Sequence, residues 1–230
     1  KIKIKYQKKH LSSHYEITPF NFEPVLAKKI NLQCVLSGSA LSRNHGILSN
    51  ELKKNNLPIN AKCYFLVNGY EPVLQAKSTS IAINEFSSAF YNLNPDIVLI
   101  VGDRYEVLGA AIASSYMNIP VAHIQGGELS GSIDESLRHA MSKFSNFHFV
   151  ANTDAKLRLI KMGEKKNNIF VVGCPSIDAL NKANEVNVKL LNNKFNFNFQ
   201  NKFACMLQHP VTSENKSSKI QIIQTLKALK

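Results

Sequence analysis

Long apolar runs are absent from this sequence of 230 residues. No stretch approaches the roughly 18 consecutive apolar residues that a membrane-spanning helix needs, and no signal-peptide pattern opens the chain. We therefore expect a cytoplasmic protein with no membrane partner. The hydrophobic fraction of 44% still leaves ample material for a globular core.

Cysteines are few and scattered along the chain, at Cys34, Cys63, Cys174 and Cys205. Their spacing fits neither a disulfide framework nor a zinc site, so we interpret them as reduced core thiols. No His/Cys/Asp spacing fits another metal site, and neither a P-loop nor a G-x-S-x-G motif occurs. We expect no metal ion.

Acidic residues are outnumbered by basic ones, 16 against 28, which gives a net charge of +12. The lysines are spread along the whole chain, however, and no zinc-finger, RNP-like or basic-helix pattern occurs. We expect no nucleic-acid partner. The positive field is better interpreted as one that attracts an anionic small substrate.

Short apolar runs alternate with helical stretches, which predicts an α/β fold with a doubly wound, mostly parallel sheet. Strands are predicted at residues 2–6, 32–36, 63–67, 97–101, 120–124, 147–150, 169–172 and 203–207. Helices are predicted at residues 19–30 and 47–54, along a face that ends at residue 93, and between the strands at 97–101 and 120–124. Further helices are predicted at residues 133–144 and 153–162, from about 174, at 186–191 and from about 216 onward.

The amino-acid composition changes after residue 180, where a stretch rich in Asn and Lys follows. We expect a Rossmann-like N-terminal domain at residues 1–180, a linker at 181–201 and the start of a truncated second domain at 202–230. His209 follows the strand predicted there. It is either a structural histidine or one that faces a crevice between domains.

Two β-branched runs, at residues 97–101 and 120–124, each end in glycine and charged residues. The carboxyl ends of parallel strands border the ligand crevice of an open α/β sheet, so Asp103 and the turn at residues 125–128 are expected side by side. Asp103 as a helix cap and a plain strand-to-loop turn are the alternatives. Gly126 and Gly127 would let the backbone approach a ligand.

A helix is predicted to begin at Ser132, because Ser132 and Glu135 have the spacing of a capping box. Asp134 and Arg138 lie four residues apart on this helix, as do Glu135 and His139. The spacing favours surface ion pairs. The alternative is that Asp134 and His139 point into the crevice.

Together these motifs resemble those of the hydrolysing UDP-N-acetylglucosamine 2-epimerases, enzymes that feed the synthesis of sialic, legionaminic and related nonulosonic acids. The resemblance extends from about residue 32 to residue 214. It is carried by residues 101–106 (VGDRYE), 123–128 (HIQGGE), 131–140 (GSIDESLRHA), 173–178 (GCPSID) and 209–212 (HPVT).

The resemblance implies two Rossmann-like domains facing each other across a cleft, as in the GT-B glycosyltransferases. It implies loss of the C2 proton and departure of UDP from C1, then hydration of the 2-acetamidoglucal to free N-acetylmannosamine, without metal or redox cofactor. The expected catalytic residues are Asp103, Asp134, Gln125 and His209. The expected substrate-binding residues are Arg104, Gly126, Gly127, Glu128, Arg138 and His139.

Within this set the resemblance places His209 near the diphosphate, with Arg138 and His139 supporting Asp134. We also expect a homo-oligomer. Three departures from the family pattern stand out. Gln125 replaces the commoner glutamate and can only form hydrogen bonds. Residues 10–15 lack the arginine of the family's first loop, and most of the second domain is missing.

The expected substrate is UDP-N-acetylglucosamine. The alternative is a UDP-2,4-diacetamido-2,4,6-trideoxy sugar, which Gln125 and the Tyr105-Glu106 pair favour. The same motifs are also compatible with a GT-B glycosyltransferase and with a truncated domain that only binds sugar or a partner chain. Incubation with nucleotide sugar alone separates the epimerase from the transferase, because only the epimerase releases free sugar without an acceptor.

Overall fold

The computed structural model describes residues 3–4, 31–42, 52–53, 56–69, 71–182, 187–208 and 217–229. The chain divides into two compact units, Lys1–Ala179 and Leu180–Lys230. The first unit carries β1 (Lys3–Ile4), β2 (Val35–Ser37), the 3-10 helix η1 (Gly38–Leu41), β3 (Ala61–Cys63), α3 (Pro72–Leu93), β4 (Val98–Val101), α4 (Tyr105–Tyr116), β5 (Val121–Ile124), α5 (Ile133–Lys143), β6 (Phe147–Val150), α6 (Thr153–Lys161), the 3-10 helix η3 (Lys166–Asn168) and β7 (Ile169–Val171), with α7 (Pro175–Lys182) at its end.

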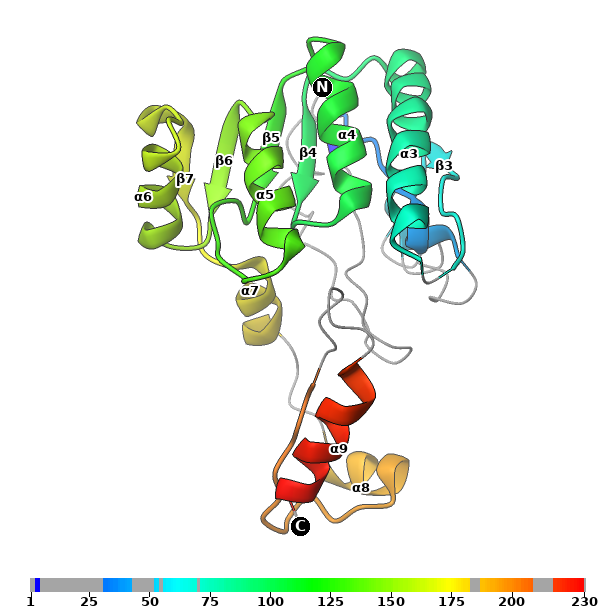
Figure 1. The fold of residues 1–230 in the computed structure, drawn as a ribbon, viewed down its shortest axis with the longest axis vertical. Coiled ribbons are helices and arrows are strands. Elements are labelled where there is room, and N and C mark those ends of the chain that lie inside the picture. Colours follow the sequence, from blue (N-terminus) through cyan, green and yellow to red (C-terminus); the bar gives the residue numbers. More distant parts are fainter. Residues whose placement is uncertain are drawn as a thin grey trace. The chain divides into compact units, whose positions relative to one another are not determined.

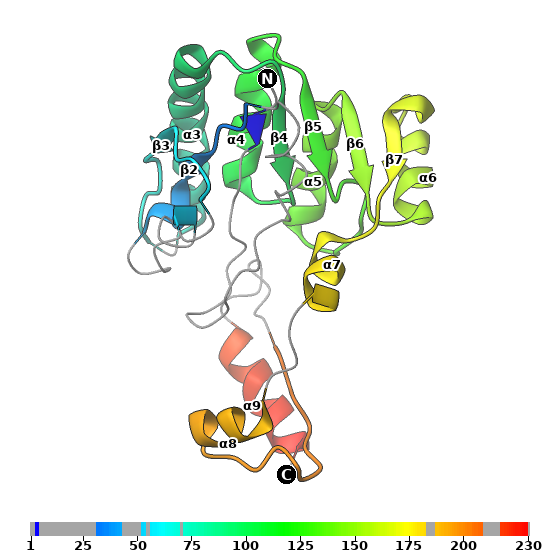
Figure 2. The ribbon, with the colours of Figure 1, turned by 180° about the vertical axis from the view of Figure 1, so that it is seen from behind.

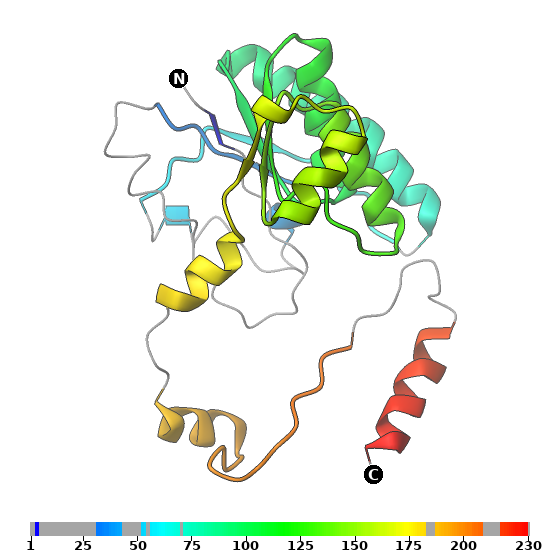
Figure 3. The same cartoon turned by 90° about the vertical axis from the view of Figure 1, so that its left-hand side faces the viewer.

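The main sheet is parallel throughout, in the strand order β1-β4-β5-β6-β7, and β2 pairs with β3 in a second parallel sheet. Parallel neighbours require a crossover, and α4, α5 and α6 supply it between β4 and β7. Helices α4 and α5 lie over one face of the sheet (Figures 1 and 3), and β1 lies beside β4 (Figure 2). The predicted α/β class with a doubly wound, mostly parallel sheet is confirmed.

The largest core cluster joins β4 and β5 to helices α3 and α4 through buried Phe86, Ile100, Val107 and Val121. The two helices approach closely at Gly109 of α4, where an added Cβ would lie 2.7 Å from the Cβ of Ala82 on α3. A second cluster packs α6 onto β6 and β7. The helices are therefore fixed on the strands whose ends form the candidate site.

The strand predicted at residues 63–67 is misplaced, because β3 ends at Cys63. Beyond it, side chains of α3 take the backbone N–H groups that a sheet would need. The Tyr64 N–H donates to Glu85 Oε2 at 3.2 Å, and the Val67 N–H donates to Ser78 Oγ at 2.9 Å. The predicted helix at residues 19–30 and most of the one at 47–54 lie outside the described residues.

The interpretation of all four cysteines as core thiols is partly wrong. Cys174 is half-buried and Cys205 is exposed, whereas Cys34 and Cys63 are buried. Burial raises the pKa of the Cys34 thiol to about 11. Of the four, only Cys34, which directly precedes β2, and Cys63 on β3 lie in the core.

The second unit contains α8 (Val188–Phe195) and α9 (Ser218–Ala228). The predicted helix near the chain end is confirmed, but residues 203–207 form no strand. A strand needs a neighbour for its N–H and C=O groups, and no strand of the described chain pairs with this exposed stretch. Within the described residues, no helix combines the length and apolar character required to span a membrane.

Candidate active site

Asp103 lies just beyond the carboxyl end of β4 and is 3% exposed. It follows Gly102, whose φ of +82° is one that glycine adopts readily. The Gly102 N–H donates to the Ile124 carbonyl at 3.2 Å, and the Gly102 carbonyl accepts from His123 Nε2 at 2.9 Å. These bonds join the ends of β4 and β5 and hold the backbone that leads into Asp103.

His123 is a buried histidine whose two ring nitrogens both have hydrogen-bond partners. Burial lowers its pKa to about 4, so the ring is neutral near pH 7 and carries one N–H. The Gly102 carbonyl can only accept, which places that proton on Nε2. Nδ1 then accepts from the Ser142 hydroxyl on α5, 3.1 Å away, so the histidine links three elements below the rim.

Arg138 of α5 connects Asp103 to the turn at residues 125–128. One of its terminal nitrogens donates to Asp103 Oδ2, and the other donates to the Glu128 carbonyl at 2.6 Å. The predicted ion pair between Asp134 and Arg138 is wrong. Arg138 is buried, and a buried guanidinium needs an inward partner more than a surface pair worth a few tenths of a kcal/mol.

Asp134 lies in the first turn of α5, one turn before Arg138, and is half-buried. Its charge is felt by Arg104 at the start of α4. Burial lowers the pKa of the Arg104 guanidinium, but the hydrogen bonds and charge of Glu106, with smaller contributions from Tyr105 and Asp134, raise it above its ordinary value. Asp134 therefore lies on the same helix as the Arg138 that pairs with Asp103, and its charge acts on Arg104, the residue after Asp103.

Arg104 does not point freely into this rim. Its Nε and one terminal nitrogen donate to the two carboxylate oxygens of Glu106, each at 2.9 Å. Glu106 is fully buried, so this bidentate pair anchors the N-terminal turn of α4. Part of Arg104 remains exposed at the rim.

Gln125 occupies the left-handed region, with a φ of +62°. Its N–H donates to the Phe149 carbonyl at 2.9 Å, and its side-chain Nε2 donates to Cys174 Sγ at 3.3 Å. Non-glycine residues held in this region are concentrated at functional sites. The side chain of Gln125 therefore spans from the end of β5 to the segment after β7.

Gly126 and Gly127 are required by the protein's own packing. An added Cβ at Gly126 would lie 2.8 Å from Ser142 Oγ, and one at Gly127 would lie 2.6 Å from the Ala155 carbonyl oxygen. Gly127 also has a φ of +77°. Close packing against α5 and α6 explains why both positions are glycine. The approach of a ligand to these glycines stays a prediction.

Arg158 of α6 is a site residue that the sequence motifs do not mark. One of its terminal nitrogens donates to the Gly127 carbonyl, next to the Glu128 carbonyl that Arg138 holds. Two arginines from two helices thus clamp consecutive carbonyls of the turn. The only sequence signal for Arg158 is a basic residue on the helix that follows a rim strand.

The hydrogen-bond partners of Glu135 differ from those of the predicted capping box. Helix α5 begins after Ser132 as expected, but Glu135 Oε2 accepts from the N–H groups of Ser130 and Gly131, at 2.7 and 2.8 Å, instead of that of Ser132. These bonds lower the pKa of the Glu135 carboxyl. Burial lowers the pKa of His139, whose Nδ1 has no hydrogen-bond partner within the described chain. His209 lies outside the described residues.

The parallel sheet and the rim at its carboxyl edge define a Rossmann-like domain of the GT-B type. A crystal structure of UDP-GlcNAc 2-epimerase from Neisseria meningitidis, bound to UDP-GlcNAc, superposes with a TM-score of 0.61 at 20% identity, covering 85% of this chain and 50% of that one. The chain belongs to the UDP-N-acetylglucosamine 2-epimerase family, whose sequence pattern matches residues 25–230.

Two curated relatives are similar over most of the chain. The UDP-N,N'-diacetylbacillosamine 2-epimerase (hydrolyzing) of Legionella pneumophila is 37% identical over 202 residues, which cover 88% of this chain and 54% of that protein. The GDP/UDP-N,N'-diacetylbacillosamine 2-epimerase (hydrolyzing) of Campylobacter jejuni is 35% identical, covering 88% and 53%. The chain spans about half the length of both.

Proposed function

We propose that this protein is a hydrolysing UDP-sugar 2-epimerase. In the proposed reaction a base removes the proton at C2 of the hexose, the C1–O bond breaks and UDP departs as the anion, leaving a 2-acetamidoglucal. Water then adds across the double bond, with its oxygen at C1 and a proton at C2 on the opposite face from the original one. The products are UDP and the free 2-epimeric sugar.

The observation that carries the proposal is the ion pair between Asp103 and Arg138, which links the end of β4 to α5, the helix whose first turn holds Asp134. Asp103 is ion-paired with Arg138 and is proposed as the base that accepts the C2 proton. Asp134 is half-buried in the first turn of α5 and is proposed as the second acid–base group. General acid–base catalysis of this kind contributes typically 10²–10⁴-fold.

The remaining expected residues take binding roles in this proposal. Arg104, Glu128 and His139 are proposed to bind the substrate, and Gln125 is proposed to contribute hydrogen bonds only, because an amide cannot take the proton. A linker at residues 181–201, a second-domain start at 202–230 and a place for His209 near the diphosphate stay part of the proposal.

The proposed substrate is a UDP-2,4-diacetamido-2,4,6-trideoxy sugar of the diacetylbacillosamine type. Both relatives described above, at 37% and 35% identity, carry names of enzymes acting on such a sugar. Gln125, where the commoner family motif has glutamate, favours the same substrate. UDP-N-acetylglucosamine is the second candidate, supported by the family description.

The proposal predicts that Asp103→Asn abolishes proton exchange at C2. In deuterated water the wild-type protein incorporates deuterium at C2 of the sugar, and the variant should lose this incorporation by about 10²-fold or more. Asp154→Asn, at an exposed carboxylate on α6, is the matched control and should exchange at the wild-type rate. Exchange at that rate in Asp103→Asn would remove Asp103 from the chemistry.

A further inference from the structure

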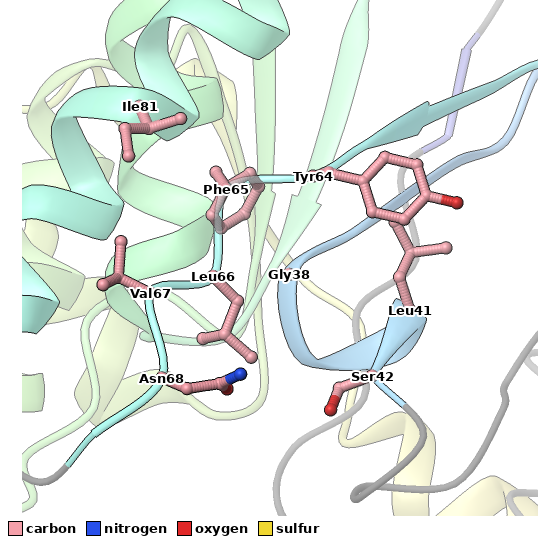
Figure 4. A pocket seen from close by; sticks show the side chains of 9 residues that line it. All are labelled: Gly38, Leu41, Ser42, Tyr64, Phe65, Leu66, Val67, Asn68 and Ile81. Carbon is pink, nitrogen blue, oxygen red and sulfur yellow. The ribbon is translucent and has the colours of Figure 1, made fainter.

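A pocket of about 320 Å³ opens between η1 and the segment that follows β3 (Figure 4). Leu41 and Ser42 lie on its η1 side, and Tyr64, Leu66 and Asn68 lie on the other. The pocket thus sits at the carboxyl ends of β2 and β3, which is where open α/β sheets bind ligands. None of the residues assigned to the reaction lines it.

The pocket lies close to Glu106, the buried partner of Arg104. Gly38 lines the pocket with a φ of +57°, and its backbone packs closely against the side chains of Phe65 and Glu106. An added Cβ would lie 3.0 Å from Phe65 Cε2 and 3.2 Å from Glu106 Cγ. Glu106 in turn holds Arg104 at 2.9 Å, and Arg104 follows Asp103 directly, so one buried side chain connects the pocket lining to the residues that follow β4.

The side of the pocket formed by the segment after β3 is held in place by contacts within the protein. The segment after β3 is held onto α3 by the bonds from the Tyr64 and Val67 N–H groups to Glu85 and Ser78. Behind it the Phe65 ring packs against Phe86, with ring centroids 5.6 Å apart. A pocket held in place in the free protein binds without the cost of ordering its walls.

The described residues that line the pocket carry no charge, although the chain has 28 basic residues. Its polar groups are the hydroxyls of Ser42 and Tyr64 and the amide of Asn68, and the remainder is apolar. Partial burial of a phosphate without a cation is costly, whereas an amide and a methyl group find both hydrogen-bond partners and apolar contacts here. The rim arginines, by contrast, lie outside the pocket.

We propose that this pocket binds the uncharged acetamido and methyl substituents of the sugar and so selects N-acylated trideoxyhexoses over N-acetylglucosamine. The inference rests on the proposed function for the identity of the sugar. A volume of about 320 Å³ is at the lower end of small-molecule sites, roughly 300–1,000 Å³. The pocket therefore accommodates the substituted part of one hexose and leaves the nucleotide outside.

A binding experiment tests the pocket without requiring turnover. The protein is labelled with ¹³C at its leucine methyl groups, with Leu41 and Leu66 assigned, and titrated separately with free N,N'-diacetylbacillosamine and with UDP. The diacetyl sugar should shift the signals of both leucines, and UDP should leave them in place. Shifts caused by UDP but not by the sugar would overturn the inference, and so would the absence of any shift.

A substitution then tests selectivity. Leu66→Trp narrows the pocket and should lower kcat/KM for the diacetamido substrate about tenfold relative to UDP-N-acetylglucosamine. Leu226→Trp, at an exposed leucine of α9, is the matched control and should leave the ratio unchanged. An equal loss for both substrates in Leu66→Trp contradicts the inference. If the wild type turns over neither substrate while the sugar still shifts Leu41 and Leu66, the proposed function fails and the pocket stands.

Discussion

At the scale of single residues, the partners of the site side chains are the least predictable feature. The four-residue spacing predicts that Arg138 pairs with Asp134, yet Arg138 forms its ion pair with Asp103, which lies 35 positions away in the sequence. Spacing along a helix reports only which side chains are neighbours on its surface. Burial of Arg138 is set by the packing of α5 on the sheet, and no local pattern encodes it.

Arg158 and Glu106 illustrate the same limit. Arg158 reaches the Gly127 carbonyl across 31 positions, and Glu106 is fully buried although a lone glutamate at a helix start usually remains in water. The types and approximate places of Asp103, Asp134 and Gln125 are nevertheless predictable, because each lies at the end of a strand or the start of a helix.

His123 makes the stability of the fold depend on pH. Its pKa falls from 6.5 to about 4 on folding, so below pH 6.5 the unfolded chain takes up a proton that the folded chain does not. The free energy of unfolding should be highest above pH 6.5 and fall by about 3 kcal/mol toward pH 4. Urea unfolding followed at several pH values measures this.

His123→Gln provides the comparison, since glutamine does not titrate. The variant should be less stable overall and should show a shallower loss between pH 6.5 and pH 4. Burial also lowers the pKa of His148, despite its contact with Glu164, so some loss of the same sign remains. Identical pH slopes in the variant and the wild type would exclude His123 as the source.

At the scale of elements, the order of strands and helices from β4 to α7 follows the hydrophobic pattern closely. The errors fall where one element depends on another. Strand β3 ends at Cys63 because side chains of α3 capture the next N–H groups. Residues 203–207 have strand-like composition but pair with no strand of the described chain. A strand is a property of a pair of segments, which one segment alone does not encode.

The contact between α3 and α4 yields a prediction at this scale. Gly109→Ala improves helix propensity by about 1 kcal/mol, but its Cβ would lie 2.7 Å from Ala82 Cβ and 3.2 Å from the Ala82 backbone. Overpacking costs about 1–3 kcal/mol, so the variant should be less stable than the wild type. Thermal and urea unfolding measure the difference.

The double variant Gly109→Ala with Ala82→Gly tests the cause. Removal of the Ala82 methyl group relieves the closer of the two contacts, so the double variant should recover part of the stability that Gly109→Ala loses, after allowance for the cost of Ala82→Gly alone. Strictly additive losses would show that the two positions do not press on each other.

At the scale of the whole molecule, one edge of a parallel sheet gathers groups from four segments of the chain. The ends of β4 and β5 and helices α4 and α5 supply Asp103, Asp134 and the guanidinium groups of Arg104 and Arg138, and Glu106 of α4 lies close to Gly38, which lines the pocket after β2 and β3. Strand topology makes this convergence predictable from the sequence, whereas the pocket depends on a turn at Gly38 that no motif marks.

The family of the chain is established over residues 25–230, and the central chemical claim of the proposed function is proton removal at C2 with release of free sugar. The most direct measurement is a proton NMR spectrum of the products formed from a UDP-diacetamido-trideoxy sugar in deuterated water with no acceptor present. We predict UDP and a free 2-epimeric sugar that carries deuterium at C2. A sugar that is released with its original C2 proton, or that stays attached to UDP until an acceptor is added, would contradict the account.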